Sequence, residues 1–167
     1  PVTNVLPVAL VIGGGVSGMT AALELGRQGF EAHLIEREGE LGGHLRHIHY
    51  LLGSENPQEM LKSIIRDVYE NERIHVHLNA EIVGVEGYLG NFKTTIRSDG
   101  NGKQIEHGII IVATGATDYK PTEYLYGVDP RVLTQRELED RLAKAQFEGK
   151  TVVMVQCVGS RNETRPN

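Results

Sequence analysis

Apolar runs and helical stripes alternate at the start of the chain. Residues 8–12, VALVI, form a short run without polar alternation, which is typical of a buried parallel strand. Residues 16–28 place apolar side chains near helical spacing, and Gly29 follows where a helix commonly ends. Residues 31–35, EAHLI, predict a second strand. These segments predict one βαβ unit with a right-handed crossover.

The same alternation continues to residue 78. Residues 39–56 are rich in Gly and His and predict a loop, with room for a short helical piece. Pro57 suits a first helical turn, and an apolar stripe predicts a helix from there to about Tyr69. Residues 74–78, IHVHL, predict a third parallel strand, so the sheet grows beyond the first βαβ unit.

The pattern then changes to short strands with turn signals between them. The segments EIVGVEGYLG, NFKTTIRS and KQIEHGIIIVAT predict an antiparallel meander over about residues 80–108. Gly90-Asn91 and Asp99–Gly102 mark the turns between its strands. The wholly apolar run 109–113 predicts a return to a buried central sheet.

The last part of the chain predicts one helix and one strand. Residues 116–132 have no regular pattern. Thr134–Glu137 has the form of a capping box, which predicts a helix to about Gln146 that Gly149 closes. Residues 151–158, TVVMVQCV, predict a final buried strand.

The elements together predict an α/β fold, a Rossmann-like domain. It has a mostly parallel sheet with helices on both faces and a small antiparallel β-meander as an insertion. We assign residues 1–115 to this domain, and residues 116–167 to a connecting segment, a helix and a final strand. This second part is interpreted as the truncated start of whatever follows.

Composition narrows the class of protein. The chain has 167 residues, a net charge of −5 and 40% hydrophobic residues, which indicates one globular domain or one domain plus part of another. The negative charge argues against a nucleic acid or an anionic membrane as the main partner. No apolar run reaches the roughly 18 residues of a membrane span.

The single Cys excludes an internal disulfide, which favours a reducing compartment such as the cytoplasm. Because the chain starts at Pro1 without Met and stops after a Gly-Ser-Arg turn, we expect a fragment of a longer protein.

A glycine motif stands between the first strand and the first helix. Gly13, Gly15 and Gly18 form G-x-G-x-x-G, with Val16 and Ser17 inside it. The first glycine allows a tight turn, the second lets a pyrophosphate approach the backbone, and the third lets the helix pack close to the strand. Unpaired N–H groups and the positive end of the helix dipole would meet the phosphates.

An acid ends the next strand. Glu36 can accept both hydroxyls of an adenosine ribose, which favours an intact 2′-hydroxyl over a 2′-phosphate. The glycine loop and the acid together predict a bound dinucleotide, but they do not distinguish NAD from FAD. The alternative is a degenerate unit that packs in the same way and binds nothing.

Further motifs resemble the flavoproteins with two dinucleotide-binding domains. Glu36-Arg37 is followed by Leu41-Gly42-Gly43, and the meander is followed by Ala113-Thr114-Gly115. In that superfamily the Gly-Gly pair leaves room for the FAD pyrophosphate and ribityl chain, and the A-T-G closes on the flavin side. The resemblance therefore implies FAD rather than NAD. It implies cofactor contacts from Arg37, from Gly42, Gly43, His44 and Leu45, from the backbone of Ile82 to the adenine, and from Ala113, Thr114 and Gly115.

The remaining histidines and the cysteine have simpler interpretations. Imidazoles are common metal ligands, so a metal site in GHLRHIHY is one alternative. We interpret His44, His47 and His49 as a polar loop beside the cofactor, where Arg46 could offset phosphate charge. His33, His75 and His77 alternate in strands and are interpreted as surface or sheet residues rather than ligands. Cys157 is predicted to be a buried small apolar residue, because one Cys makes neither a C-x-x-C pair nor an iron–sulfur site, which usually takes four. No Ser-His-Asp set or carboxylate pair stands out, so no catalytic side chain is predicted.

Four stretches together resemble one family over essentially the whole chain. They are GGHLRHIHY, EGYLGNFKTTI, ATGATDYKPTEYLYG and VVMVQCVGSRNE, and the family is that of heterodisulfide reductase A. Its members are cytosolic iron–sulfur flavoproteins whose FAD passes electrons among partner subunits. The resemblance implies that Cys157 is an iron–sulfur ligand in the full-length parent, with no cluster in this piece. It implies partners among other heterodisulfide reductase subunits or a hydrogenase- or ferredoxin-type electron donor.

The sequence thus predicts the FAD-binding portion of a flavin-dependent oxidoreductase that resembles heterodisulfide reductase A, inactive as an isolated piece. One alternative is an NAD(P)H-dependent flavin oxidoreductase, which would need a second glycine loop and a C-x-x-C that these residues lack. Another is a non-catalytic dinucleotide-binding module that docks partner subunits. An NAD-dependent dehydrogenase fits the glycines but leaves Gly42-Gly43 and the A-T-G unexplained.

Overall fold

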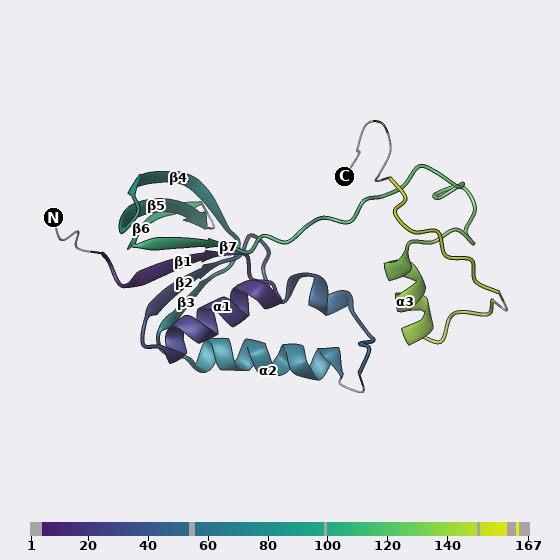
Figure 1. Ribbon diagram of the computed structural model, residues 1–167, viewed down its shortest axis with the longest axis horizontal. Coiled ribbons are helices and arrows are strands. Elements are labelled where there is room, and N and C mark those ends of the chain that lie inside the picture. The colour runs from purple at the N-terminus through teal and green to yellow at the C-terminus, as the bar shows by residue number, and fades with distance from the viewer. Residues whose placement is uncertain (1–4, 54–55, 99, 150, 160–162, 164–167) are drawn as a thin grey trace. The chain divides into compact units, whose positions relative to one another are not determined.

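The chain, seen in a computed structural model that describes residues 5–53, 56–98, 100–149, 151–159 and 163, forms two compact units (Figure 1). The first unit comprises Pro1–Arg46 and Glu55–Gly115, and the second comprises His47–Ser54 and Ala116–Asn167. Residues 47–54 thus group with the second unit, although they fall inside the first predicted domain. The domain boundary at residue 115 stays a prediction.

A four-stranded parallel sheet forms the middle of the first unit. Its strands lie in the order β3-β2-β1-β7, which are Ile74–His77, Glu31–Ile35, Val8–Ile12 and Ile109–Val112. The strands β2 and β7 pair in parallel with either side of β1, so β1 is central. Because β1 has strand neighbours on both sides, its residues Ala9, Leu10 and Val11 are buried, as the unbroken apolar run predicts.

Two helices follow the first two strands. Helix α1 spans Val16–Arg27, and Gly29 beyond it has a φ of 89° and donates its N–H to the carbonyl of Gly26. Helix α2 spans Pro57–Glu70. The side chain of Asn56 accepts from the N–H groups of Gln58 and Glu59, which caps the start of α2. The predictions that Gly29 follows the end of the first helix and that Pro57 begins the second helix are confirmed.

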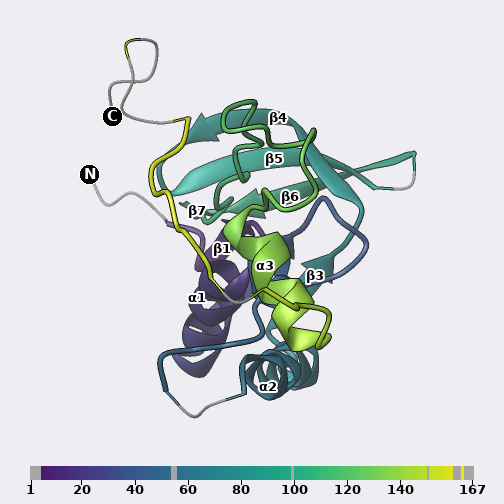
Figure 2. The same cartoon turned by 90° about the vertical axis from the view of Figure 1, so that its right-hand side faces the viewer.

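An antiparallel sheet covers the face of the parallel sheet opposite α1 and α2 (Figures 1 and 2). Its strands are β4, β5 and β6, at Ala80–Tyr88, Asn91–Ser98 and Asn101–His107, paired in that order. The meander is thus confirmed, although Asp99 of its second turn lies outside the described residues. The prediction of helices on both faces is wrong for the described part of this unit. The crossovers from β1 to β2 and from β2 to β3 run in one direction and have one hand, so both helices lie on the same face.

The core between the two sheets is apolar. Its buried members are Leu10, Ile35, Ala80, Ile96 and Ile105, and the partly buried Ile12, Ile82 and Ile110 pack against them. The strands β5 and β6 also contain a buried polar pair, in which Thr94 Oγ1 lies 2.7 Å from His107 Nε2. The other ring nitrogen, His107 Nδ1, lies 3.0 Å from the carbonyl oxygen of Ile109, so both nitrogens of the buried ring have partners.

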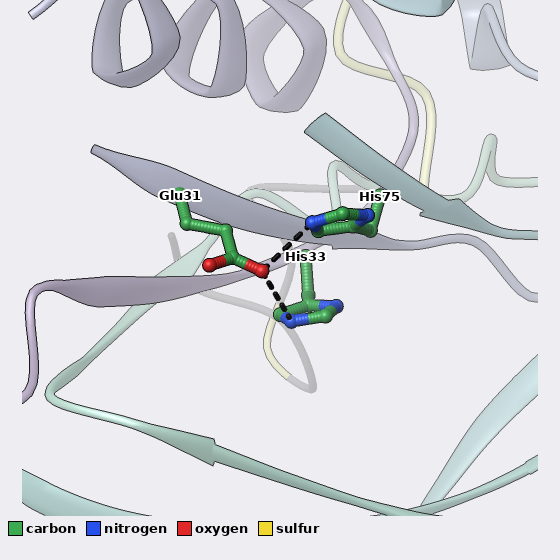
Figure 3. A group of neighbouring side chains, drawn as sticks. All are labelled: Glu31, His33 and His75. Atoms are coloured by element: carbon green, nitrogen blue, oxygen red, sulfur yellow. Dashed lines mark ion pairs between the residues drawn. The ribbon is translucent and has the colours of Figure 1, made fainter. Parts of the chain in front are cut away.

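Three histidines stack on the strands β2 and β3. His33 Nδ1 lies 3.0 Å from His77 Nε2, and the His33 ring stacks on those of His75 and His77. Figure 3 shows Glu31 beside His33 and His75. Burial, followed by the positive charges that His77, His75 and Lys103 can carry, lowers the pKa of His33 to about 4. Burial and the charge of Lys103 likewise lower the pKa of His77 to about 4.

This stack predicts a loss of stability in acid. In the unfolded chain these histidines protonate near pH 6.5, whereas in the folded chain they protonate near 4. Between these values the unfolded state binds more protons, so the contribution is complete above pH 6.5 and is lost as the pH falls towards 4. Urea unfolding in metal-free buffer should show this, with a shallower acid slope for His77→Asn than for the wild type. Equal slopes for both proteins would contradict it.

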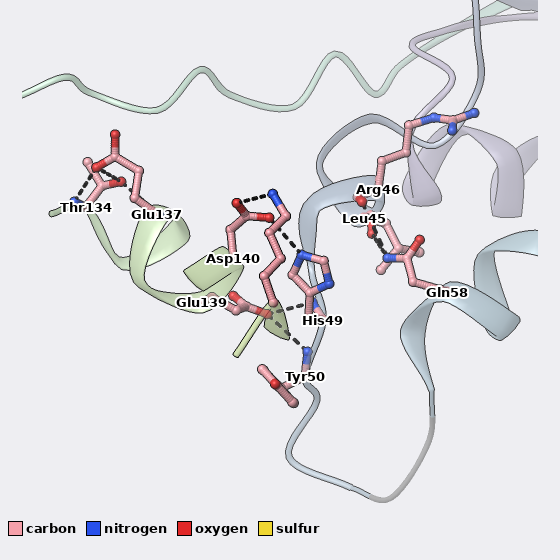
Figure 4. A network of polar contacts seen from close by, with 10 residues as sticks. Leu45, Arg46, His49, Tyr50, Gln58, Thr134, Glu137, Glu139 and Asp140 are labelled. Atoms are coloured by element: carbon pink, nitrogen blue, oxygen red, sulfur yellow. Dashed lines mark hydrogen bonds and ion pairs between the residues drawn. The ribbon is translucent and has the colours of Figure 1, made fainter. Parts of the chain in front are cut away.

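The helix α3, Gln135–Ala143, begins in the second unit as predicted. The N–H of Glu137 donates to Thr134 Oγ1, and the N–H of Thr134 donates to Glu137 Oε2, 2.8 Å away, which confirms the capping box (Figure 4). The predicted end at Gln146 is wrong. Ala145 adopts a φ of 53°, and the N–H of Gln146 turns back to the carbonyl of Arg141. An alanine makes the left-handed turn that sequence rules expect from Gly149.

The predicted final buried strand is absent from the described residues 151–159. Its central residue Val153 is 84% exposed, and Cys157 is exposed as well. The predictions of a buried strand and of a buried Cys157 are therefore both wrong. An apolar run becomes a buried strand only where another strand offers hydrogen bonds, and local sequence does not supply that partner. The Gly-Ser-Arg turn falls mostly on residues outside those described.

Candidate dinucleotide-binding site

The parallel sheet has a topological switch point between β1 and β7. From β1 the chain moves to β2 and β3 on one side, and it returns to β7 on the other side. Open α/β sheets bind ligands at the carboxyl ends of the strands at such a point. Gly13 follows β1 there, and Ala113 follows β7, where its N–H donates to the carbonyl of Ile12 at 2.8 Å. The glycine loop and the A-T-G segment thus meet at this point.

Two of the motif glycines are required by close packing. Gly13 has a φ of 109°, and a Cβ there would overlap the carbonyl oxygen of Ala113. A Cβ on Gly18 would overlap the carbonyl oxygen of Gly13, because α1 lies directly on the loop. These contacts are the tight turn and the close approach of helix to strand that the motif predicts.

Gly15 differs, because the space beside it is open. A Cβ at Gly15 would meet no protein atom within 4 Å, and its φ of −72° suits any residue. Gly15 is the N-cap of α1 and has no side chain to cap the helix, and Val16 and Ser17 in the first turn are exposed. The first turn also contains no acidic residue. This end of α1 therefore has the geometry and the electrostatics that an anionic phosphate group needs.

Glu36 lies against the glycine loop. Its Oε2 accepts the N–H of Gly14 at 2.7 Å, and its Oε1 accepts the N–H of Glu38 at 2.9 Å. The side chain is buried, at 8% exposure for the residue. A carboxylate offers about four acceptor positions, so both oxygens can still receive ribose hydroxyls. The structure thus places the predicted acid beside the predicted phosphate loop.

The Gly42-Gly43 pair runs alongside the same loop. The N–H of Gly42 donates to the carbonyl of Gly14 at 2.8 Å, and Gly15 and Gly42 form an isolated parallel bridge. A Cβ on Gly43 would lie 3.3 Å from the Cα of Gly15. After the pair, in the short 3-10 helix Gly43–His47, His44 is exposed and Leu45 is buried. Small residues on both segments keep this side of the loop open.

The sequence interpretation missed Gly14, which holds these segments together. Gly14 is buried, its N–H binds Glu36, and its carbonyl binds Gly42. A Cβ at Gly14 would lie 2.5 Å from Leu41 Cδ2 and 2.9 Å from Glu36 Oε2. The run of three consecutive glycines was the available signal, because the motif itself requires only the first and third of them.

Other predicted residues lie less close to the loop. Arg37 is exposed, and its Nε lies 3.3 Å from Glu38. Arg46 is held within its own loop by the carbonyl of Leu41, at 2.5 Å, and by Glu40, at 3.0 Å.

Ile82 and His49 each have other contacts in the structure. The side chain of Ile82 packs into the core between the sheets, while its backbone lies on the edge strand β4. Its contact with adenine stays a prediction. His49 instead belongs to the second unit, where its N–H donates to Glu139 of α3 at 2.6 Å (Figure 4).

Replacing Glu36 by glutamine tests this arrangement. The amide nitrogen would face one of the two backbone N–H groups that the carboxylate now accepts, so that N–H loses its acceptor. We expect the free energy of unfolding to fall by about 1–3 kcal/mol. Urea denaturation measures this, and Glu38→Gln, at an exposed neighbour, is the matched control. An unfolding midpoint for Glu36→Gln equal to that of the control would contradict the assigned bonds.

The fold and the converging loops define an α/β dinucleotide-binding domain. The family model for pyridine nucleotide-disulphide oxidoreductases matches residues 8–156. The chain therefore belongs to the pyridine nucleotide-disulphide oxidoreductase family. This match confirms the predicted fold class, a Rossmann-like domain with a parallel sheet and a small antiparallel sheet.

Curated relatives confirm the predicted resemblance to heterodisulfide reductase A. One is the A 2 iron-sulfur subunit of the CoB–CoM heterodisulfide reductase of Methanopyrus kandleri, 40% identical over 89 residues that cover 53% of this chain and 14% of that protein. Another is the A subunit of the H(2):CoB-CoM heterodisulfide,ferredoxin reductase of Methanothermobacter marburgensis. It is 26% identical over 247 aligned positions, which cover 93% of this chain and 38% of that one. The chain thus spans well under half the length of either relative.

Solved structures share the fold of the chain. One is L-proline dehydrogenase from P. horikoshii, with a TM-score of 0.59 and 28% identity over 66% of this chain and 23% of that one. Another is an oxidoreductase from Agrobacterium tumefaciens, with a TM-score of 0.55 and 30% identity over 70% of this chain and 39% of that one. Among the described residues, no helix is both long and apolar enough to span a membrane.

Proposed function

We propose that this chain is the FAD-binding portion of a flavin-dependent oxidoreductase related to heterodisulfide reductase A. The observation that carries the proposal is the meeting of four separate segments at one switch point. The glycine loop, Glu36, the Gly42-Gly43 pair and the A-T-G segment are joined there by hydrogen bonds. A dinucleotide fold alone requires only the first two of these segments.

The residues present fit FAD in its extended form. Gly15 and the N–H groups of Val16 and Ser17 would bind the pyrophosphate, and Glu36 would bind the adenosine ribose. Gly42 to Leu45 would flank the ribityl chain, and Ala113 to Gly115 would lie towards the flavin. When bound, FAD supplies the redox chemistry, and the protein contributes binding, orientation and electrostatics. No side chain of this chain is assigned an acid or base role.

We further propose that electrons pass through this flavin between iron–sulfur clusters or partner subunits of the parent. The names of the relatives support this, because one contains the term iron-sulfur and the other the term ferredoxin reductase. Cys157, which is exposed in this chain, would be one cluster ligand in the parent. Partners would be other heterodisulfide reductase subunits, or a hydrogenase- or ferredoxin-type donor, in the cytoplasm.

A titration with three ligands tests the cofactor proposal. FAD binding is followed by its fluorescence, FMN is titrated in the same way, and NAD is titrated by calorimetry. We expect FAD to bind at least about tenfold more tightly than FMN, because FMN lacks the adenosine that Glu36 and the glycine loop would bind. NAD binding tighter than that of FAD would favour a dehydrogenase. Failure of both dinucleotides to bind would favour the degenerate unit that packs in the same way and binds nothing.

A further inference from the structure

A second cluster of polar side chains lies at the other end of the strands from the dinucleotide site. Glu31 begins β2 and His33 lies at its middle, while His75 is the register partner of His33 on β3. In parallel strands, register partners point to the same face of the sheet. Ala32 and Leu34, which alternate with these residues, are buried. Three potential ligands from two strands are thus gathered on one face.

The three side chains converge on one small volume. Glu31 Oε1 lies 2.7 Å from His75 Nε2 and 3.8 Å from His33 Nε2, so one carboxylate oxygen faces two imidazoles (Figure 3). The candidate ligand atoms all lie within 4.8 Å of one another. A tetrahedral ion with bonds of about 2.0–2.1 Å separates its ligand atoms by about 3.3 Å, which lies within this range. Small side-chain rotations are enough to reach that geometry.

His77 contacts His33 through the ring nitrogen of His33 that does not face Glu31. Its Nε2 lies 3.0 Å from His33 Nδ1, the ring nitrogen that points away from Glu31. In metal sites, a bound histidine nearly always uses its other ring nitrogen in a hydrogen bond that fixes the ring and its tautomer. The stacking of His33 on His75 and His77 restricts the ring further. The His33 ring is therefore oriented before any ion arrives.

We propose that Glu31, His33 and His75 bind one divalent metal ion of the Zn²⁺ class. Two imidazoles and one carboxylate are a ligand set that suits Zn²⁺ and its neighbours rather than Ca²⁺ or Mg²⁺. Glu31 and His75 are about half exposed, with side-chain exposures of 46% and 43%, so an ion can enter from solvent and keep water as its remaining ligand. The ion would tie β2 to the edge strand β3.

The proposal revises the interpretation of these histidines as sheet residues without a ligand role. Alternation along each strand gave no reason to pair His33 with His75, because a parallel register is set by the fold. The site is separate from the dinucleotide loops, so the test of metal binding does not depend on whether the chain binds FAD.

Calorimetric titration with Zn²⁺ tests the site in the wild-type chain, Glu31→Gln and His75→Asn. We expect one Zn²⁺ per wild-type chain and affinities about tenfold or more lower in each variant. His47→Asn is the matched control, because His47 is an exposed histidine outside the cluster. Zn²⁺ should also raise the thermal unfolding midpoint of the wild type and the control, and this rise should be much smaller in Glu31→Gln.

Several results would overturn the proposal. Binding that is unchanged in both Glu31→Gln and His75→Asn would place the ion elsewhere. A loss in His47→Asn as large as in His75→Asn would point to the 44–49 loop. If the wild-type chain does not bind Zn²⁺ stoichiometrically, the proposed site does not exist. The thermal midpoints without Zn²⁺ show whether each variant is folded, so a loss of binding is not mistaken for a loss of structure.

Discussion

Replacement of Gly18 by alanine is expected to lower the free energy of unfolding by about 3 kcal/mol. The added Cβ would overlap the carbonyl oxygen of Gly13, which is backbone and cannot rotate away. The first turn of α1 would have to move off the loop, and Met19 next to it is fully buried in the packed core. Urea denaturation followed by circular dichroism measures the loss.

Gly102→Ala is the matched control for this change. A Cβ at Gly102 meets nothing within 4 Å, and its backbone does not need positive φ. Its effect on the free energy of unfolding should stay within about 0.5 kcal/mol. An unfolding midpoint for Gly18→Ala equal to that of Gly102→Ala would show that α1 does not lie against the loop as described.

Replacement of Gly15 by alanine is expected to weaken FAD binding on the order of a hundredfold while leaving the fold intact. A Cβ at Gly15 contacts no protein atom, so it would occupy the space proposed for the pyrophosphate. Because alanine is a poorer N-cap than glycine, we expect a stability loss of about 1 kcal/mol or less. Fluorescence titration with FAD, alongside urea denaturation, separates the two effects.

The substitutions at Gly15 and Gly18 are expected to have different effects. Gly18→Ala would lose stability first, whereas Gly15→Ala would lose affinity with nearly normal stability. Gly102→Ala, far from the loop in sequence, should bind FAD like the wild type. If Gly15→Ala retains wild-type FAD affinity, the phosphate groups do not approach the backbone at this position, and the proposed pose is wrong.

Much of the first unit follows from local patterns. The apolar runs at 8–12 and 109–113, together with the caps at Gly29 and Pro57, indicate the strands and helices within a few residues. The order of the motifs then indicates the site, because the glycine loop, the acid and the A-T-G each follow a strand. The carboxyl ends of parallel strands meet at one edge, so these residues converge without further information.

What sequence reasoning missed depends on partners distant in the chain. Residues 151–158 have the composition of a buried strand, but strand formation requires a hydrogen-bonding neighbour that composition does not specify. The pairing of His33 with His75 depends on the register of β2 with β3. The end of α3 depends on Ala145 adopting positive φ, which is unusual for a residue with a side chain. Each of these misses is set by context rather than by local propensity.

The visible absorbance spectrum of the purified chain, after saturation with FAD and desalting, tests the central claim most directly. If the four converging segments form an FAD site, the oxidised flavin bands stay with the protein, close to one FAD per chain. Gly15→Ala, treated in parallel, should lose most of the bound flavin on the same column. A folded wild-type chain that emerges colourless and still binds NAD would contradict the assignment of this site to FAD.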